Sequence, residues 1–329
     1  MKVRTFSMVE NLIKEIKGKN IRIVFPEGSE PRILQAAARL HHDEILCPVL
    51  LGDPDEIKQA AQDLGLDIEG IDIVDHLHFE SMEEMARMMV ELRRGKLDQA
   101  SAKAMLEGTN YFGTMYVKMG YADGLLGGAT YSTADTVRPA LQLIKTKPNN
   151  SIVSSCFILC KGEERLVFGD CSINIAPTED DLVEITMETA KTAKFFGIDP
   201  VVSLLSYSSM GSAKGESVNK VRSATQRLKN IALDYPVDGE LQFDASVSPV
   251  VAKVKAPQSK VAGRANVFMF PNIDAANIGY KIASRLGGYE AVGPILQGLN
   301  APINDLSRGC TSEEVYKMAI VTAMATLIQ

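Results

Sequence analysis

The sequence has no tryptophan, and no run of about 18 apolar residues, the length that a helix needs to cross a bilayer. Residues 1–20 lack the unbroken apolar segment of a secretory signal peptide, and Glu10, Lys14, Glu15 and Lys17 predict a charged amphipathic helix instead. Basic runs interleaved with aromatic residues are also absent, and the net charge is −6. The sequence therefore argues against a membrane protein and against a nucleic-acid-binding surface.

Signatures of several common sites are missing too. Neither half of the chain has G-x-G-x-x-G after its first expected strand, which weakens a nicotinamide-binding interpretation. The P-loop pattern G-x-x-x-x-G-K-[ST] and the zinc-protease pattern H-E-x-x-H do not occur. G-x-S-x-G is absent as well, so the nucleophile elbow of a serine hydrolase is not supported.

The cysteines are few and are not spaced as metal ligands. The five are Cys47, Cys156, Cys160, Cys171 and Cys310. An odd number of cysteines without ligand spacing predicts reduced thiols and no metal site, and reduced thiols are typical of a cytoplasmic protein.

Strands alternate with helices along the chain, which predicts an α/β protein with parallel sheets. A length of 329 residues is enough for about two domains. We expect two three-layer α/β/α domains with an interdomain cleft. The first half has expected strands at 20–26, 43–52, 71–75 and 122–129, and expected helices at 31–40, from 53 on, at 81–95 and at 98–106.

The polar segment 145–150 is the best candidate for a linker, and the pattern changes after it. Apolar runs at 152–160 and 166–175, joined by a charged turn, predict a hairpin and hence an antiparallel pair. Beyond it we expect helices at 179–196, 217–233 and 275–286 and strands at 201–206, 239–243 and 266–270. The predicted domains are 1–147 with 296–329, whose C-terminal helix returns to the first domain, and 148–295.

The segment 302–314, P-I-N-D-L-S-R-G-C-T-S-E-E, concentrates groups that can do chemistry. It holds the Ser307 hydroxyl and the Arg308 cation just before an apolar helix. Thr311 is spaced as the N-cap of that helix and Glu314 as its capping-box partner. The amides of a helix N-terminus together with an arginine can bind an anion such as phosphate. A purely structural cap remains the alternative.

Two glycine-containing junctions follow expected strands. In the first, Gly128 precedes Ser132, which can cap a helix while Asp135 reaches back as its capping-box partner. Arg138 lies in the second turn of that helix. The second, 206–215, is rich in serine and glycine and suits an oxyanion or a phosphate. Ligands of open α/β sheets bind at such strand ends, and a tight turn is the alternative for each junction. Arg93 and Arg285 lie near helix C-termini, where arginine commonly serves the helix dipole.

Taken together, segments spread over the whole chain resemble the phosphate acetyltransferase (phosphotransacetylase) family. The segments are V-F-P-E, Y-S-T-A-D-T-V-R-P-A-L, S-Y-S-S-M-G-S-A, D-G-E-L-Q-F-D-A, A-N-V-F-M-F-P, N-I-G-Y-K-I-A-S-R-L and G-P-I-L-Q-G-L-N-A-P-I-N-D-L-S-R-G-C. The resemblance implies reversible transfer of acetyl between acetyl phosphate and coenzyme A, with phosphate as the other product. It also implies a homodimer, an isocitrate/isopropylmalate dehydrogenase-like fold, and no cofactor beyond coenzyme A as a substrate.

The resemblance assigns roles residue by residue. Ser307 and Arg308 match the active-site Ser-Arg pair of the family. Arg285, Arg138 and Arg93 match arginines that bind coenzyme A or acetyl phosphate or take part in catalysis. Glu314 stands where the general base of the family can be aspartate, and we expect it to take the thiol proton. The junction residues Ser132 and Gly128 complete the expected substrate-binding set.

The chemistry fits these residue types. A free thiol has a pKa of about 8.5, so a nearby carboxylate helps to deprotonate it as it attacks. Ser307 and the arginines can meet the oxyanion and the departing phosphate. The thiol nucleophile belongs to coenzyme A, so Cys310 is expected to be a buried loop residue. A phosphate butyryltransferase, a metal- and NAD-dependent decarboxylating dehydrogenase and a catalytically silent coenzyme A-binding module remain alternatives.

Overall fold

The computed structural model describes residues 8–328, and its contacts divide the chain into two compact units. Unit 1 runs to Asn149 and resumes at Leu299, and unit 2 comprises Asn150–Gly298. The sequence predicts the second boundary after 295. Strand β10 (Glu290–Gln297), which was not predicted, pairs with the sheet of unit 2 and carries the boundary beyond that point. The N-terminal helix predicted over 1–20 is present as α1 (Met8–Ile16), residues 17–20 form a turn instead, and 1–7 lie outside the described residues.

Unit 1 is built on a parallel sheet of five strands in the order β11-β4-β1-β2-β3. Its strands are β1 (Arg22–Phe25), β2 (Cys47–Leu51), β3 (Asp72–Val74), β4 (Gly124–Gly127) and β11 (Ile303–Asp305). Its remaining helices are α2 (Pro31–His42), α3 (Pro54–Asp63), α4 (Met82–Leu92), α5 (Gln99–Leu106), α6 (Thr109–Lys118), α7 (Thr133–Pro139), the π-helix η1 (Ala140–Ile144), α13 (Ser312–Ala325) and the 3-10 helix η2 (Thr326–Ile328). From β1 the chain winds outward to β2 and β3, and the later strands β4 and β11 lie on the other side of β1. The direction of winding therefore switches between β1 and β4, which is where ligands of such sheets bind.

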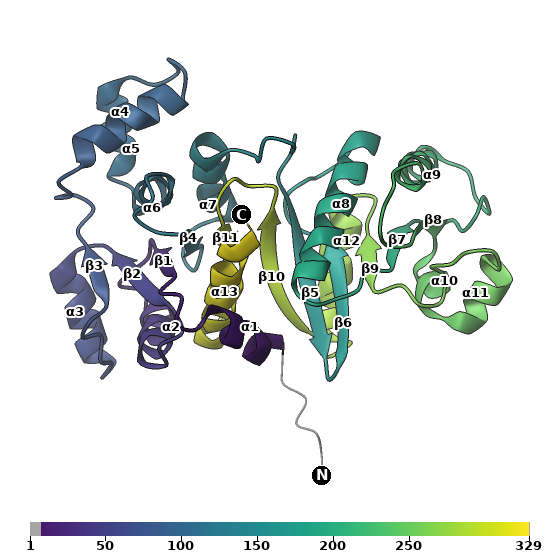
Figure 1. Ribbon diagram of the computed structural model, residues 1–329, viewed down its shortest axis with the longest axis horizontal. Helices are drawn as coiled ribbons and strands as arrows, with labels where there is room; N and C mark the ends of the chain where they lie inside the picture. Colours follow the sequence, from purple (N-terminus) through teal and green to yellow (C-terminus); the bar gives the residue numbers. More distant parts are fainter. Residues whose placement is uncertain (1–7, 329) are drawn as a thin grey trace, which may run out of the picture. The chain divides into compact units, whose positions relative to one another are not determined.

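The central strand β1 is stabilised by burial on both sides. Ile23, Val24 and Phe25 are fully buried, and burying each contributes about 2 kcal/mol relative to exposure. Pro26 follows at once and favours the end of the strand. Helices α2 and α13 contact each other beside one face of the sheet, and α6 contacts β1 and β4 from the other face (Figure 1).

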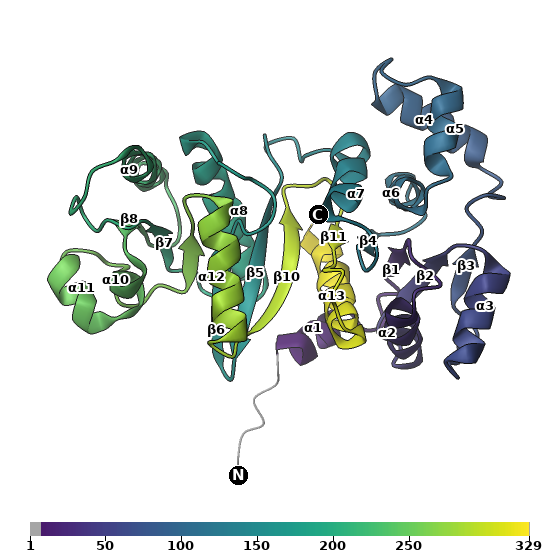
Figure 2. The same cartoon turned by 180° about the vertical axis from the view of Figure 1, so that it is seen from behind.

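Unit 2 has a mixed sheet of six strands in the order β10-β5-β6-β9-β7-β8. Its other strands are β5 (Ser154–Lys161), β6 (Glu164–Gly169), β7 (Val202–Leu205), β8 (Val237–Leu241) and β9 (Val267–Met269). Its helices are α8 (Glu179–Phe195), α9 (Glu216–Lys229), α10 (Phe243–Val247), α11 (Pro249–Lys255) and α12 (Ile273–Arg285). Strands β5 and β6 form the predicted antiparallel hairpin. Helix α8 lies in front of this sheet in Figure 1 and α12 in front of it in Figure 2, so the two cover opposite faces.

The structure contains elements that the sequence analysis did not predict: α6, α10, α11, β10 and β11. The expected strand 43–52 begins only at Cys47, and its early residues form the turn after α2. The α/β class and the alternation of strands and helices are as predicted.

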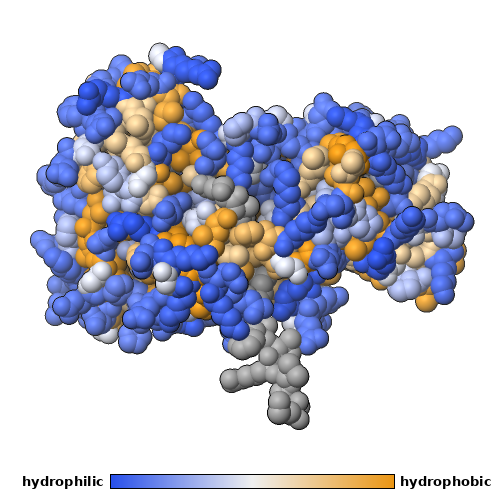
Figure 3. Space-filling view, viewed as in Figure 1, coloured by the Kyte–Doolittle hydropathy of each residue, from blue (hydrophilic) through white to orange (hydrophobic). Residues whose placement is uncertain are grey.

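Among residues 8–328, no helix combines the length and the apolar character needed to cross a membrane. The face in Figure 3 is mostly hydrophilic, with hydrophobic groups in patches, including the outer side of α11. Val250 and Val254 on that helix are 74% and 80% exposed.

Candidate functional site

The loop between β11 and α13 presents the predicted pair Ser307 and Arg308 at the surface of unit 1. Both side chains are exposed, whereas Asp305 and Leu306 just before them are buried. The Leu306 amide donates to the Gly127 carbonyl at 2.7 Å, which ties the start of the loop to the end of β4. The loop therefore connects a strand, β11, to the helix α13.

The predicted capping box at the start of α13 is present. The Glu314 amide donates to Thr311 Oγ1 at 3.2 Å, and Glu314 Oε2 accepts from the Thr311 amide at 2.7 Å and its hydroxyl at 3.1 Å. Glu314 is nonetheless exposed, so its carboxylate faces solvent while Oε2 serves the cap. Glu314 therefore caps α13, and its exposed carboxylate can also contact a substrate.

The second predicted capping box, Ser132 with Asp135, is present at the start of α7. Hydrogen bonds from Ser132 hold the pKa of the Asp135 carboxyl below its usual value, and the charges of Arg138 and Arg308 act in the same direction. Arg308, from the β11–α13 loop, therefore lies within electrostatic reach of the N-terminus of α7. The structure brings Ser132, Arg138 and Arg308 into one neighbourhood.

Two of the predicted arginines share a third neighbour, Tyr111 on α6. Burial raises the pKa of Tyr111, and the charges of Arg138 and Arg93 oppose that rise. Arg138 is exposed, and Arg93 follows the last residue of α4 with its Nε buried and without a hydrogen-bond partner among the described residues. Arg285 is the exposed last residue of α12 and belongs to unit 2, so it is not part of this cluster within unit 1.

Sequence reasoning missed Arg32, which ties the two loops together. Its Nη1 donates to the carbonyls of Arg308 at 2.8 Å and Cys310 at 3.0 Å, and its Nη2 donates to the Ala129 carbonyl at 2.9 Å. Glu30 pairs with the same guanidinium at 2.7 Å and directs it. The only local signal was an arginine in the first turn of α2, five residues after Glu27 of the V-F-P-E segment, because the partners of Arg32 are far away in sequence.

Amides in both glycine-containing loops already bind carboxylates of the protein. The Gly128 amide donates to Glu27 Oε2 at 2.8 Å. In the loop 206–215, the Gly211 amide and the Ser208 hydroxyl both donate to Glu240 Oε1, at 2.8 and 2.9 Å. In each loop a buried glutamate of the chain itself supplies the negative charge.

Gly128 is required for a different reason. Its φ is +104°, and a Cβ there would lie 2.4 Å from Asp305 Oδ1 and 2.9 Å from the Leu306 amide nitrogen. Any side chain at this position would push the β4–α7 loop away from the β11–α13 loop. Gly128 therefore lets the two loops approach each other closely.

Asp305 is a buried carboxylic acid beside these loops. It is 2% exposed, Oδ2 accepts from Thr133 Oγ1 at 2.7 Å, and Oδ1 has no hydrogen-bond partner among the described residues. Burial raises its pKa to about 6, and the nearby charge of Glu27 adds to the rise. The folded protein therefore holds the Asp305 proton more tightly than the unfolded chain does.

This raised pKa predicts a loss of stability with rising pH. Between the unfolded value of 3.8 and the folded value of about 6, the native state binds more protons, so the free energy of unfolding falls across that range. The full effect is about 3 kcal/mol. We expect Asp305→Asn to remove this part of the pH dependence in urea unfolding measured from pH 4 to pH 8. Asp67→Asn, which removes an exposed carboxylate of unit 1, controls for net charge. Identical pH profiles for wild type and Asp305→Asn would contradict the assignment.

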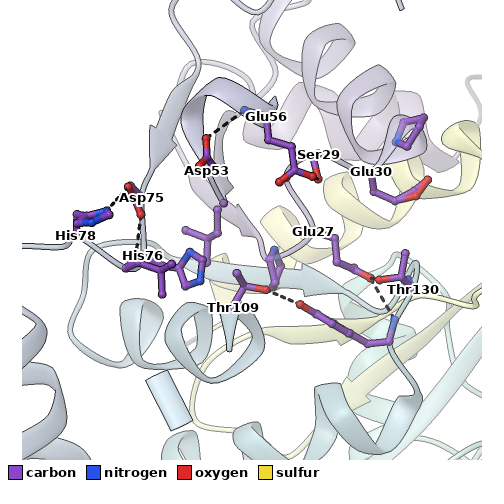
Figure 4. Close-up of a pocket in the computed structure, with 17 residues that line it drawn as sticks. Glu27, Ser29, Glu30, Asp53, Glu56, Asp75, His76, His78, Thr109 and Thr130 are labelled. Carbon is purple, nitrogen blue, oxygen red and sulfur yellow. Dashed lines mark hydrogen bonds and ion pairs between the residues drawn. The ribbon is translucent and has the colours of Figure 1, made fainter. Parts of the chain in front are cut away.

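A cavity of about 640 Å³ opens at the ends of β1, β2 and β3 (Figure 4). Its lining is acidic, with carboxylates of Glu30, Asp53, Glu56 and Asp75 and with Glu27, whose carboxylate is directed at Thr130 (Figure 4). These carboxylates serve hydrogen bonds and ion pairs of the fold, such as the cap of α3 by Asp53. Ser307 and Arg308 do not line this cavity, whereas Glu27, Thr130 and Tyr131 do.

Within the described part of the chain, no three or more His, Cys, Asp or Glu side chains are grouped so that they could hold a metal ion. The five cysteines all lie in the part of the chain that the structure describes and form no disulfide there, and Cys310 is buried in its loop, as expected. Burial raises the pKa of the Cys310 thiol.

Comparison with known proteins gives a consistent result over the whole length. A family model described as Phosphate acetyl/butaryl transferase matches residues 7–323. The chain is 51% identical over 322 residues to a phosphate acetyltransferase of Bacillus subtilis, covering 98% of this chain and 99% of that protein. A phosphotransacetylase structure from Streptococcus pyogenes superposes with a TM-score of 0.95 at 49% identity, covering 100% of each chain. A putative 4-hydroxythreonine-4-phosphate dehydrogenase from Salmonella typhimurium shares the fold alone, with a TM-score of 0.54 at 13% identity over 93% of this chain and 99% of that one.

Proposed function

The chain belongs to the phosphate acetyl/butyryl transferase family, and on that premise we propose how its residues transfer acetyl between acetyl phosphate and coenzyme A. The observation that carries the proposal is a group of side chains beyond the carboxyl ends of the neighbouring parallel strands β4 and β11: Ser307, Arg308, Ser132 and Arg138. Glu314 lies in the first turn of α13, the helix that follows β11. Hydroxyls, guanidinium groups and an exposed carboxylate are the groups that this reaction needs.

Glu314 is the general base. As the coenzyme A sulfur attacks the acetyl carbon, the thiol proton moves to the Glu314 carboxylate. A carbon–sulfur bond forms and the carbon–oxygen bond to phosphate breaks, so the products are acetyl-CoA, phosphate and a protonated Glu314. The attack is direct, in a ternary complex, and no group of the protein is acylated.

Ser307 and Arg308 stabilise the charge that develops in this step. The Ser307 hydroxyl donates to the oxyanion on the acetyl carbon, and Arg308 meets the phosphate as negative charge builds on it. Both side chains are exposed in a loop that is held at each end, by the Gly127 carbonyl and by the capping box of α13. Donors fixed in this way need little reorganisation during the reaction.

The remaining arginines bind the phosphates of the two substrates. Arg93 and Arg138 share the neighbour Tyr111, and the N-terminus of α7 with Ser132 lies beside Arg308. Arg285, on unit 2, adds a further cation for coenzyme A. Arginine suits phosphate because its planar guanidinium group can donate two parallel hydrogen bonds to two phosphate oxygens. Coenzyme A enters as a substrate, and no other cofactor is required.

The activity is tested by mixing the purified protein with coenzyme A and acetyl phosphate and following the ultraviolet absorbance of the thioester. We expect thioester to form without added metal and in the presence of a chelator. Butyryl phosphate in a parallel arm measures the acyl-chain range and separates a butyryltransferase. Absence of turnover with every acyl phosphate, by a folded protein that still binds coenzyme A, would leave a silent binding module.

Ligand binding provides an independent prediction. Coenzyme A or phosphate at about a hundred times its Kd should stabilise the native state by about 2.7 kcal/mol and raise Tm accordingly. NAD with magnesium should leave Tm unchanged. Differential scanning fluorimetry measures both, and a shift with NAD and magnesium but none with coenzyme A would favour the dehydrogenase alternative.

We also propose that the chain forms a homodimer in the cytoplasm. Ile278 and Ile282 on α12 and Leu286, which follows its last residue, are spaced every fourth residue. They are 57%, 53% and 85% exposed and form an apolar stripe on one face. A stripe of this kind is typical of a covered surface. Light scattering should report a dimer for the wild type and a monomer for Ile282→Asp, and a wild-type monomer would exclude the proposal. Five cysteines that form no disulfide among the described residues fit a reducing compartment.

A further inference from the structure

Four consecutive backbone amides of the β4–α7 loop converge on one side chain, Glu27. The amides of Gly128 and Ala129 donate to Oε2 at 2.8 and 3.1 Å, and those of Thr130 and Tyr131 donate to Oε1 at 2.5 and 3.2 Å. The Thr130 hydroxyl adds a fifth bond at 2.6 Å, and Glu27 is 8% exposed. Figure 4 shows this carboxylate directed at Thr130. A concave set of amides at a strand-to-helix junction commonly binds phosphate, and here a side chain of the protein fills it.

The location of this amide nest (the amides of 128–131) makes its occupant significant. Glu27 is the second residue after the end of β1, and Gly128 is the first residue after the end of β4. These two strands are neighbours in the sheet, and the winding direction changes between them. This is the point where open α/β sheets place their ligands. The protein therefore puts its own anion at the position that a substrate anion would otherwise take.

The nest is connected to the transferase residues on both sides. It leads directly into Ser132, which caps α7, and the Ala129 carbonyl shares the Arg32 guanidinium with the Arg308 carbonyl. Asp305 approaches the same loop from the end of β11. The place of the Glu27 carboxylate thus fixes where α7 begins relative to Arg308.

We propose that Glu27 is a positioning residue of the acetyl transfer reaction and an internal blocking anion. It holds 128–131 in the conformation that sets Ser132 and Arg138 beside Arg308. Its buried charge also repels a second anion, so that phosphate and acetyl phosphate bind at Arg308 and not in the nest. The proposal rests on the proposed function because it concerns the site for phosphate.

The test removes the Glu27 carboxylate by mutation and then supplies a free carboxylate in solution. Glu27→Ala leaves the nest amides unfilled, and we expect kcat to fall roughly tenfold or more because Ser132 and Arg138 are no longer held in place. Added formate, a free carboxylate, should restore part of that rate in a saturable way and should not accelerate the wild type. Isothermal titration calorimetry with inorganic phosphate should show one more bound phosphate for Glu27→Ala than for wild type, and formate should displace it.

Two further variants keep the proposal falsifiable. Asp53→Ala also removes a carboxylate that accepts from two amides, at the N-terminus of α3, and should lower stability with kcat unchanged and no response to formate. Glu27→Gln keeps the shape and removes the charge, and it decides the matter if Glu27→Ala does not fold. We expect a reduced kcat in Glu27→Gln that formate does not restore, because the amide side chain still occupies the nest.

Wild-type kcat in either folded Glu27 variant, or a loss of kcat in Glu27→Ala that formate leaves unchanged, would overturn the proposal. A wild type without any transferase activity would instead remove the proposed function.

Discussion

Arg308→Gln should lower turnover about a hundredfold while the fold stays intact. The side chain is exposed in the β11–α13 loop, and the contacts that hold the loop use its backbone: the Arg308 carbonyl accepts from Arg32 at 2.8 Å. Replacing the guanidinium therefore leaves those contacts in place. What is lost is a charge-assisted contact to the phosphate in the transition state, which is worth roughly 3 kcal/mol.

The measurement compares kcat and kcat/KM of Arg308→Gln with those of the wild type, together with Tm. Arg87→Gln, which removes an exposed arginine on α4, serves as the matched control and should retain full turnover. Equal activity of Arg308→Gln and wild type would remove Arg308 from the catalytic set. A large fall in Tm of Arg308→Gln, together with the loss of turnover, would point to a structural role of Arg308.

Local sequence patterns predicted the parts of the site that depend on neighbours in the chain. The capping boxes at Thr311/Glu314 and Ser132/Asp135 follow from a spacing of three residues, and both are present. Such boxes form within one helical turn, so the sequence contains all of their partners.

The organisation around Glu27 and Arg32 could not be predicted in this way. Glu27 binds amides about a hundred positions later, and Arg32 binds the Arg308 carbonyl, which lies still further along the chain. Only the fold brings these groups together. For the same reason, the sequence left open whether each glycine loop binds a ligand or forms a tight turn, and internal glutamates occupy amides in both loops.

Some elements were missed because tertiary packing overrides local pattern. Helix α6 carries Phe112 and Tyr116, whose rings pack with Phe79, and its buried aromatic and glycine content does not show a helical polar face. Strand β10 contains Pro294 and a register shift between Val292 and Ile295, so its apolar alternation is interrupted. In both cases the packing or pairing partners, Phe79 for α6 and β5 for β10, determine the structure, and the local sequence of the segment does not.

Glu314→Gln should separate the general base from the helix cap. Glutamine can accept the same hydrogen bonds from Thr311, so the free energy of unfolding should be almost unchanged. Glutamine cannot take a proton from the coenzyme A thiol, so turnover should fall roughly a hundredfold or more. Glu314→Asp should keep partial activity, because a carboxylate remains, one methylene further back.

Glu313→Gln is the matched control for this prediction. Glu313 lies beside Glu314 in the first turn of α13 and pairs with Arg39 at 2.6 Å. Its replacement removes the same charge from the same helix N-terminus, where an acidic residue is worth about 0.3–1 kcal/mol to the helix. We expect a small loss of stability in Glu313→Gln with turnover retained, so that a rate loss in Glu314→Gln cannot be assigned to the helix charge.

The pH profile supplies the decisive measurement. As pH rises toward the thiol pKa of about 8.5, more coenzyme A is already a thiolate and needs no base. The rate of Glu314→Gln relative to wild type should therefore rise with pH, whereas a variant impaired only in binding would show a constant ratio. If Glu314→Gln retains full activity at neutral pH, Glu314 is a helix cap alone. The proton of the thiol must then go to another carboxylate near Arg308, and Asp135 is the first to test because it lies within reach of the same charge.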